Sequence, residues 1–353
     1  MNITIRQMKA SEAGEAKKLA RKSFGLIEVL FMPKPKDAFV AIAEDKIVGG
    51  FVYKFENCSG KKYGFVSFLF TDPSFHGQGI GKKLMEEGIP FMWKQGCDAL
   101  VTYVRDDNVA SWILFERKGF VKASLPKIAG DTGFFGALKL CFNTAYVGAV
   151  GHEFYIAKPD NNSTSLYKKE GGPGQIAAYV IMSLLMMIPI ISRVGDISQL
   201  SIAVAAFGFV FLGCVLAGYL GTLFSKKRLW QFRLTSGGAF VYPAISIATG
   251  GFLPWIGSWY PSHYENTLPF KRDMAINAIA VWVFLLSIMV VRLFTDIDSL
   301  FLRFAANLCA PLLIIRCLPI SVFDSLGFGR VYKWNKVVLV TLVGASIYLS
   351  YIA

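Results

Sequence analysis

The stretch His76-Gly77-Gln78-Gly79-Ile80-Gly81 decides the fold of the first half of this chain. It follows an apolar, strand-like run from Tyr63 to Phe70 and precedes a helical pattern. Three glycines at alternate positions let the backbone approach a diphosphate closely. Unpaired amides and the positive end of the helix dipole stabilise its charge. The order of strand, glycine turn and helix therefore predicts a nucleotide-phosphate site.

Two common phosphate motifs do not fit this turn. A P-loop requires Ser or Thr after Gly-Lys, whereas Lys83 follows Gly81-Lys82 here. A Rossmann fingerprint requires G-x-G-x-x-G, and this chain has G-x-G-x-G. The sequence therefore excludes both of these nucleotide-binding classes.

The turn resembles the cofactor motif of the GNAT acetyltransferase superfamily, Q/R-x-x-G-x-G/A between a strand and a helix. His76, Gly79 and Gly81 fall on its three fixed positions, with His76 replacing the usual Gln or Arg. The family's second signature is matched downstream by Asn108, Ala110-Ser111 and Phe115-Glu116-Arg117-Lys118-Gly119-Phe120. The resemblance covers roughly residues 1–158. It implies an α/β domain with a mixed, mostly antiparallel sheet and flanking helices.

The resemblance also implies acetyl-CoA as the acyl donor, with no metal. The backbone around Phe70 and Thr71 would hydrogen-bond the pantetheine arm, and the amides of residues 77–82 would take the pyrophosphate. Asn108 would approach from the second helix. The implied cofactor-binding residues are Phe70, Thr71, His76, Gly77, Gln78, Gly79, Ile80, Gly81, Lys82, Asn108 and Ser111.

The sequence does not identify the catalytic residues. Attack of a neutral amine on a thioester needs an acceptor for the ammonium proton, and an acid can protonate the leaving thiolate. The family often uses a tyrosine as that acid, but Phe115 occupies its position here. Tyr103, at a strand end, and Glu56, at a hairpin end, are candidates for acid and base. Simple packing and surface roles are the alternatives for both.

The first half is expected to alternate strands and helices. A hairpin turns at Glu44-Asp45, and Pro90 bends the helix after the glycine turn. Between the last two strands lies the unusually apolar stretch 134–142, which either packs on the membrane half or the bilayer or forms a buried hairpin. The expected strands are 3–7, 39–43, 46–55, 63–70, 99–104 and a pair between 120 and 157, and the expected helices are 11–24, one through about 94, and 108–118.

Composition indicates that the second half lies in lipid. The 353 residues are 54% hydrophobic with a mean hydropathy of +0.46, too apolar for two ordinary soluble domains. The net charge is +13, and of the 37 Lys and Arg, 24 precede Glu170. These bases match no nucleic-acid reader motif, which excludes nucleic acid as the partner.

The six cysteines show no paired spacing and are expected to be reduced: Cys58, Cys97, Cys141, Cys214, Cys309 and Cys317.

A polar, glycine-rich linker is expected over 159–174, followed by an all-α polytopic membrane domain over 175–353. Six apolar segments approach the ~20 residues that span a bilayer: 175–192, 199–224, 237–259, 274–294, 300–320 and 337–353. Without a signal segment, the first domain is expected in the cytosol. Loops rich in Lys and Arg normally lie on the cytoplasmic side of the membrane. All such loops of this chain lie on that side only if segment 237–259 enters the bilayer and returns to the same face. We therefore expect five crossings, one re-entrant element and an external C-terminus.

The membrane half also resembles the core of site-2-protease-type intramembrane metalloproteases. The resemblance implies Asp324 at the position of a zinc ligand, although Ser325 replaces the glycine that normally follows it. Such a zinc site needs H-E-x-x-H, and this chain has only His76, His152 and His263. The resemblance therefore implies a degenerate scaffold that is not a protease. The matching residues are Gly250-Gly251-Phe252, Gly257-Ser258-Trp259-Tyr260-Pro261, Leu318-Pro319, Phe323-Asp324-Ser325 and Trp334-Asn335.

These expectations combine into a function. A cytosolic acetyl-CoA domain fused to a bilayer domain predicts a membrane-embedded N-acetyltransferase that acylates a primary amine at the cytosolic membrane face. The alternative is a non-catalytic acetyl-CoA sensor coupled to the protease-like scaffold. Phe115 slightly favours the sensor, and the glycine turn fits both.

Overall fold

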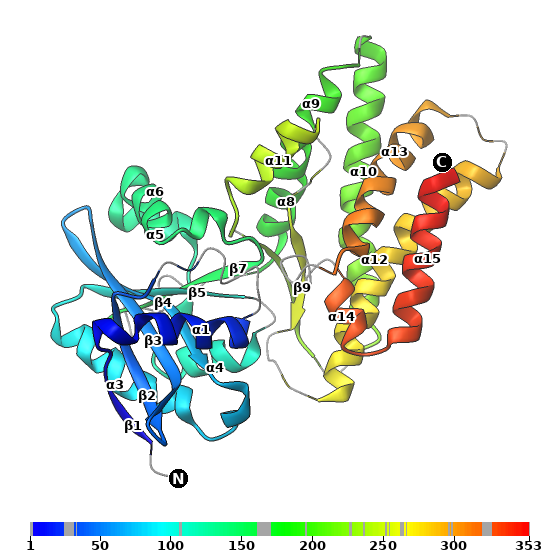
Figure 1. Cartoon of the computed structure of the whole chain (residues 1–353). Coiled ribbons are helices and arrows are strands. Elements are labelled where there is room, and N and C mark those ends of the chain that lie inside the picture. The colour runs from blue at the N-terminus through cyan, green and yellow to red at the C-terminus, as the bar shows by residue number, and fades with distance from the viewer. Residues whose placement is uncertain are drawn as a thin grey trace. The chain divides into compact units, whose positions relative to one another are not determined.

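A computed structural model of the chain shows two compact units (Figure 1). The N-terminal unit comprises residues 1–104, 110–146 and 153–169, and the C-terminal unit comprises 105–109, 147–152 and 170–353. The structure describes residues 3–24, 32, 34–105, 108–160, 171–194, 196–225, 228–235, 237–250, 253, 255–261, 265, 267–295, 297, 299–319 and 327–352. Most of the expected linker, His263, Asp324 and Ser325 lie outside these residues.

A seven-stranded sheet organises the N-terminal unit, in the order β1-β2-β3-β4-β5-β7-β6. The pairs β1–β2, β2–β3, β3–β4 and β6–β7 are antiparallel, whereas β4 and β5 run parallel. The predicted mixed, mostly antiparallel sheet is confirmed. The strands are β1 (Thr4–Gln7), β2 (Asp37–Ala43), β3 (Lys46–Cys58), β4 (Lys61–Thr71), β5 (Ala99–Arg105), β6 (Val121–Lys122) and β7 (His152–Ala157).

The hairpin between β2 and β3 turns where the sequence predicts. Glu44 and Asp45 have φ values of 49° and 59°. Two positive φ angles in succession match the twist of the flanking strands, and Asp tolerates this conformation better than most residues.

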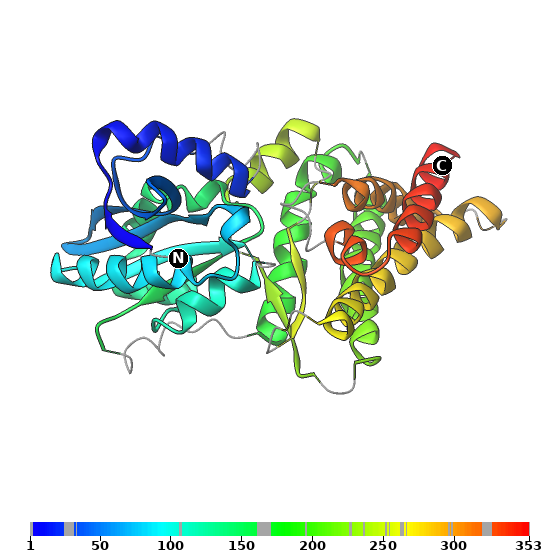
Figure 2. The same ribbon diagram turned by 60° about the horizontal axis from the view of Figure 1, so that its bottom comes forward.

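Helices cover both faces of this sheet (Figure 2). Helix α1 (Ala13–Phe24) buries Ala16, Leu19 and Ala20 in one cluster with Val52 of β3. Helix α3 (Ile80–Lys94) packs on the opposite face, where Gly88 leaves room for the ring of Phe51. Residues 51 and 52 point to opposite faces because side chains alternate along a strand. Helix α3 contains Pro90, as predicted.

The apolar stretch 134–142 does not form the buried hairpin that was one of its two predicted structures. It lies in helix α6 (Phe134–Asn143), which follows helix α5 (Leu125–Thr132). Helix α6 buries Gly136, Ala137, Leu140 and Cys141, a helical stripe that short-range inspection of an apolar run does not reveal. The side chains of Phe134 and Phe135 remain 69% and 81% exposed.

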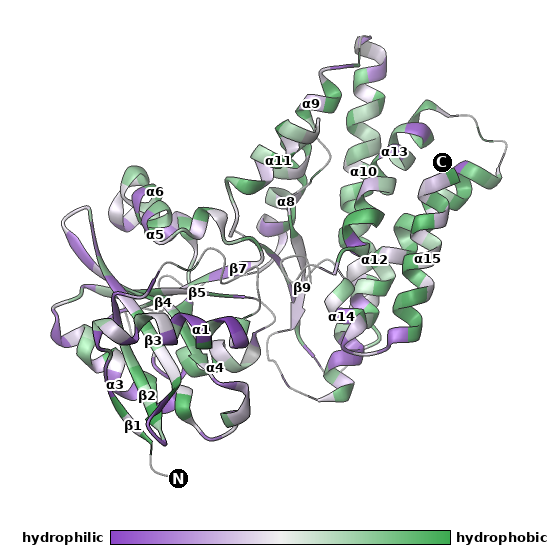
Figure 3. Ribbon diagram, viewed as in Figure 1, coloured by the Kyte–Doolittle hydropathy of each residue, from purple (hydrophilic) through white to green (hydrophobic). Residues whose placement is uncertain are grey.

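The C-terminal unit is helical, as predicted (Figure 3). Three of its described helices are long and apolar enough to cross a membrane, α10 (Ile197–Thr222), α12 (Leu268–Phe294) and α13 (Leu300–Cys317). They suggest membrane association. The other helices are α8 (Pro173–Met186), α9 (Ile188–Ile191), α11 (Val241–Thr249), α14 (Phe328–Tyr332) and α15 (Lys336–Ile352).

One short sheet interrupts the helices of this unit. Strands β8 (Trp230–Leu234) and β9 (Gly257–Pro261) pair antiparallel. The segment predicted as re-entrant, 237–259, contains the nine-residue helix α11 and enters β9. The number of crossings, the re-entrant element and the linker boundaries stay predictions.

The ion pair between Arg6 and Glu12 predicts a pH-dependent contribution to stability. The guanidinium of Arg6 binds both carboxylate oxygens of Glu12 at 2.9 and 2.6 Å and, with the amide of Lys9, lowers the pKa of Glu12 from 4.5 to about 2. A carboxyl whose pKa is lowered by folding stabilises the folded state at pH values above its ordinary pKa of 4.5. This contribution is lost as the pH falls from 4.5 towards 2. Thermal unfolding midpoints of the wild type and Glu12→Gln should differ at neutral pH and converge in acid. A difference that does not depend on pH would contradict this assignment.

Candidate functional site

The parallel strands β4 and β5 separate in the middle of the sheet. Their pairing covers Tyr63 to Val66 on β4 and Ala99 to Thr102 on β5. Strand β4 nevertheless continues to Thr71, held on its other side by β3. Backbone groups on the β5 side of this last part of β4 are therefore not used in the β4–β5 ladder. Such an open strand edge can hydrogen-bond an extended, amide-containing ligand.

The glycine turn follows directly from this open strand. Asp72 caps a short 3-10 turn by accepting from the amide and hydroxyl of Ser74, at 3.0 and 2.5 Å. Gly77 and Gly79 then adopt φ values of 82° and 73°, which favour glycine. Helix α3 begins at Ile80. The turn therefore forms where the sequence places it, between the open strand and the helix.

The first amides of α3 are not capped by a side chain. Gly79 is the N-cap and makes no side-chain hydrogen bond, and the amide of Lys83 binds the carbonyl of Gly79 at 3.0 Å. Within the helix, the amides before Lys83 have no preceding turn to donate to. A Cβ atom built on Gly77 or Gly79 meets nothing within 4 Å. The helix end therefore presents free donors beside open space, the arrangement that binds a diphosphate.

The predicted cofactor residues divide by exposure. His76, Gly77, Gln78, Gly79 and Lys82 are exposed. The side chains of Phe70 and Ile80 are buried in the core at 3% and 1% exposure, so these two residues can offer only backbone groups to a ligand.

Thr71 is partly engaged by the protein itself. Its carbonyl accepts from the hydroxyl of Ser23, at the end of α1, at 2.9 Å. A carbonyl oxygen has two lone pairs, so one remains for a ligand. Sequence reasoning missed Ser23, because a serine in the last turn of a helix carries no signal of its tertiary partner.

Helix α4 (Val109–Glu116) contributes the second predicted signature. A Cβ atom on Gly81 would contact Leu114 of α4 at 3.5 Å, so α3 begins next to this helix. Ser111 lies on α4 and is half-buried. Asn108 precedes α4 and is also half-buried. Their roles towards a cofactor stay predictions.

Phe115, which occupies the position of the tyrosine acid in the family that the chain resembles, is part of the hydrophobic core. Phe115 is 3% exposed and packs edge-to-face on Phe120 with ring centroids 5.1 Å apart. A buried phenyl ring cannot donate a proton.

Tyr103 lies at the point where the strands separate. It follows Thr102, the last paired residue of β5, and its ring lies 5.5 Å from that of Phe65 and 5.8 Å from that of Tyr146. Burial raises the pKa of Tyr103 to about 12. The phenol therefore keeps its proton at physiological pH and can act as a hydrogen-bond donor.

Glu56 is held by two donors. Its Oε1 lies 3.0 Å from Nζ of Lys54, and its Oε2 accepts from Nδ2 of Asn143 at 2.8 Å. Lys54 also donates to the carbonyl of Asn143, the last residue of α6. This small network ties α6 to β3, and it occupies both carboxylate oxygens of Glu56.

The match to known proteins falls on this part of the chain. Residues 8–120 match the acetyltransferase (GNAT) family. The mixed sheet and flanking helices of the N-terminal unit fit the fold of this family. The matched range contains the open strand, the glycine turn and α4.

Curated relatives match short stretches of the chain. Mycothiol acetyltransferase of Salinispora tropica is 37% identical over 70 residues, which are 20% of this chain and 23% of that protein. N-alpha-acetyltransferase 30 of Saccharomyces cerevisiae is 32% identical over 59 residues, 17% of this chain and 34% of that protein. The chain thus spans only about a quarter to a third of these relatives.

Solved structures show weaker similarity. The ribosomal-protein-S18-alanine N-acetyltransferase of Escherichia coli has a TM-score of 0.30 at 20% identity, covering 35% of this chain and 80% of that one. A GNAT acetyltransferase of Brucella melitensis in complex with acetyl-CoA has a TM-score of 0.28 at 17% identity, covering 34% and 82%.

The second resemblance concerns a metal site in the C-terminal unit. Across the described ranges, no group of three or more His, Cys, Asp and Glu side chains could hold a metal ion. The described cysteines are all free, as predicted.

Proposed function

We propose that this protein is a membrane-embedded N-acetyltransferase that uses acetyl-CoA to acylate a primary amine at the cytosolic membrane face. The observation that carries the proposal is the uncapped start of α3 beside the open end of β4. Free amides of residues 79–82 would bind the pyrophosphate, and unpaired backbone groups of β4 would bind the pantetheine arm. The match of residues 8–120 to GNAT acetyltransferases supports the same assignment.

The reaction requires little covalent chemistry from the protein. The amine nitrogen attacks the thioester carbon, the carbon–sulfur bond breaks, and the amine proton leaves to water or a base. Tyr103 is our candidate for the group that meets the leaving sulfur. Its pKa of about 12 exceeds the ~8.5 of a typical thiol, so we assign it a hydrogen bond to the sulfur rather than full proton transfer.

The membrane part of the proposal is supported by the three long apolar helices of the C-terminal unit. Acetyl-CoA is a cytosolic metabolite, so the proposal has the N-terminal unit on that side of the bilayer. The acceptor could be a protein N-terminus, a lysine, a polyamine or an amino-lipid.

Steady release of CoA tests this function. The full-length protein in nanodiscs is incubated with acetyl-CoA and a panel of these primary amines. Turnover with at least one amine is expected, and Tyr103→Phe should lower kcat about tenfold or more while acetyl-CoA affinity stays unchanged. Tyr53→Phe is the matched control, because Tyr53 lies on β3 rather than on either separating strand and its ring packs against Phe39 and Phe91.

Two outcomes would contradict the proposal. Tight acetyl-CoA binding without turnover on any amine would indicate a sensor rather than an enzyme. An equal loss of kcat in both tyrosine variants would remove Tyr103 from the reaction.

A further inference from the structure

The exposed apolar side chains of the N-terminal unit gather on one helix. Among the described residues of this unit, the large hydrophobic side chains that remain exposed are Phe134, Phe135 and Phe142, at 69%, 81% and 49%. All three belong to α6. The rings of Phe134 and Phe135 also meet edge-to-face, with centroids 5.5 Å apart. A contiguous apolar patch marks an interaction site, whereas scattered single residues do not.

These side chains form one face of α6. Phe134, Leu138 and Phe142 follow one another at intervals of four residues and therefore lie in one row along the helix, with Phe135 beside them. We call these four residues the aromatic face. The residues on the opposite side of the helix are buried: Gly136, Ala137, Leu140 and Cys141. The exposure is thus a property of one helix face and not of a loop.

The inner side of α5 and α6 is fixed to the hairpin of β3 and β4. The hydroxyl of Ser59 donates to the carbonyl of Thr132 at 2.6 Å, and Nζ of Lys61 lies 2.6 Å from Oδ1 of Asp131. A Cβ atom on Gly136 would collide with Ser59, so the helix lies close against the hairpin. The aromatic face cannot turn inward without breaking these contacts.

Positive charge accompanies this face. Lys139 lies beside the aromatic face on α6 and is exposed, and Lys127 on α5 is exposed as well. Asp131, the acidic residue of these two helices, lies 2.6 Å from Nζ of Lys61 and 3.4 Å from Nζ of Lys158. Four lysines and one aspartate give the region a net charge of +3.

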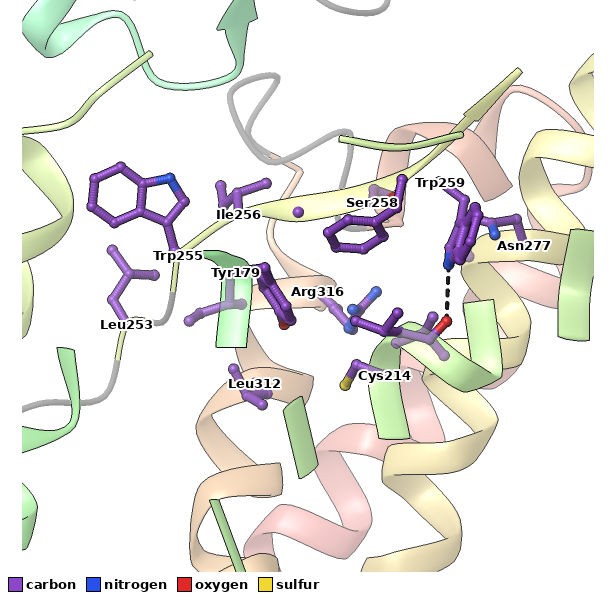
Figure 4. Close-up of a pocket in the computed structure, with 16 residues that line it drawn as sticks. Tyr179, Cys214, Leu253, Trp255, Ile256, Ser258, Trp259, Asn277, Leu312 and Arg316 are labelled. Carbon is purple, nitrogen blue, oxygen red and sulfur yellow. Dashed lines mark hydrogen bonds between the residues drawn. The ribbon is translucent and has the colours of Figure 1, made fainter. Parts of the chain in front are cut away.

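In the C-terminal unit, apolar side chains are exposed on all three helices that are long enough to cross a membrane. Examples are Leu216 on α10, Val283 on α12 and Ile314 on α13, at 53%, 51% and 48%. The cavity inside this unit, of about 40 Å³, has room for only about three water molecules and cannot hold an acyl chain (Figure 4). The outward side chains are therefore the ones that acyl chains would cover. The aromatic face of α6 exposes side chains of the same apolar kind.

The chemistry of the aromatic face matches the surface of a lipid bilayer. Phenyl rings next to lysine are typical of helices that lie at a membrane interface, where the rings enter the boundary between headgroups and acyl chains. Anionic headgroups attract the lysines. The two units are consecutive parts of one chain, so a bilayer that contains α10, α12 and α13 is held at a high effective concentration near α6.

From these observations we infer that α6 docks the N-terminal unit on an anionic lipid surface. The rings of Phe134, Phe135 and Phe142 enter the boundary below the headgroups, and Lys127 and Lys139 face the lipid phosphates. The inference rests on the membrane part of the proposed function and on no step of acetyl transfer. Docking of this kind brings the N-terminal unit to amines that are presented at the bilayer surface.

Spin labels on the full-length protein in nanodiscs test the inference. Phe135→Cys places a label on the aromatic face, Lys18→Cys on the exposed side of α1, and Val283→Cys on α12. Wild-type protein treated with the same reagent gives the background from the natural cysteines. Oxygen concentrates in lipid, whereas a nickel chelate stays in water. In nanodiscs that contain phosphatidylglycerol, oxygen should relax the labels at positions 135 and 283 more strongly than nickel does, and the label at position 18 less strongly.

The role of charge is tested with the same label. Lys139→Glu in the Phe135→Cys protein should lower the ratio of oxygen to nickel relaxation about twofold or more, because the reversed charge is repelled by phosphatidylglycerol. Lys94→Glu is the matched control, since Lys94 is an exposed lysine at the end of α3, and it should leave the ratio unchanged. Nanodiscs of phosphatidylcholine alone should also lower the ratio at position 135.

Three results would overturn the inference. Stronger relaxation by nickel at position 135, with lipid-like relaxation at position 283, would place α6 in water while the membrane part of the proposed function stands. Weak relaxation by both reagents at position 135 would show that protein covers the face, either the C-terminal unit or a second copy. An equal response to Lys139→Glu and Lys94→Glu would remove anionic lipid as the partner. Nickel-dominated relaxation at position 283 would instead contradict the membrane part of the proposed function, and this inference with it.

Discussion

Replacing Gly79 with valine is expected to abolish acetyl-CoA binding while the N-terminal unit stays folded. Gly79 has a φ of 73°, and a Cβ atom there meets no protein atom within 4 Å. The new side chain would instead project beside the uncapped amides that start α3, where we place the pyrophosphate. Loss of even two charge-assisted hydrogen bonds predicts a loss of affinity of about 100-fold or more.

Gly96→Val is the matched control for this experiment. Gly96 follows the other end of α3 with a φ of 74°, and a Cβ atom there also meets nothing within 4 Å. Both valines should cost about 1–2 kcal/mol of stability through the left-handed backbone. Isothermal titration of the two full-length variants with acetyl-CoA separates this strain from ligand binding. Wild-type affinity in Gly79→Val would refute the phosphate assignment.

Replacing Gly221 with leucine should disrupt the C-terminal unit. Helices α10 and α12 approach so closely at this point that a Cβ atom on Gly221 would lie 2.8 Å from Cα of Asn277 and 3.1 Å from the carbonyl oxygen of Ile276. Both are backbone atoms of a helix, so neither can move aside alone. Small residues at such contacts let membrane helices pack closely. The substitution should cost about 3 kcal/mol or more.

Gly208→Leu on the same helix provides the comparison, because a Cβ atom at Gly208 meets nothing within 4 Å. Thermal unfolding can be followed with a thiol-reactive dye, since Cys214 and Cys309 are buried in the core of this unit. Exposure of these thiols at a much lower temperature in Gly221→Leu alone is the expected result. Similar midpoints for the two variants would contradict the role of Gly221.

The sequence predicted those features that local chemistry determines. Glu44-Asp45 specified a hairpin because two consecutive residues had to adopt positive φ. Gly77 and Gly79 specified the turn before α3 for the same reason. Phe115 could be excluded as an acid from its side chain alone.

Features that depend on distant residues could not be predicted. Separation of β4 from β5 after Val66 is a property of the sheet, and neither strand sequence carries it. The strands β8 and β9 have five residues each, and so short a run gives only a weak signal of period two. Arg233 and Arg330 lie far apart in the sequence, on β8 and α14, and only folding buries both of them.

The restraint of Glu56 by Lys54 and Asn143 has a consequence for acceptor choice. Because both carboxylate oxygens already have donors, the proposed reaction favours an incoming amine that arrives uncharged. At pH 7, about one α-amine in seven is neutral, against about one lysine side chain in 2,500. Basicity alone would then favour weakly basic amines by more than two orders of magnitude. Discrimination of this kind requires no recognition pocket.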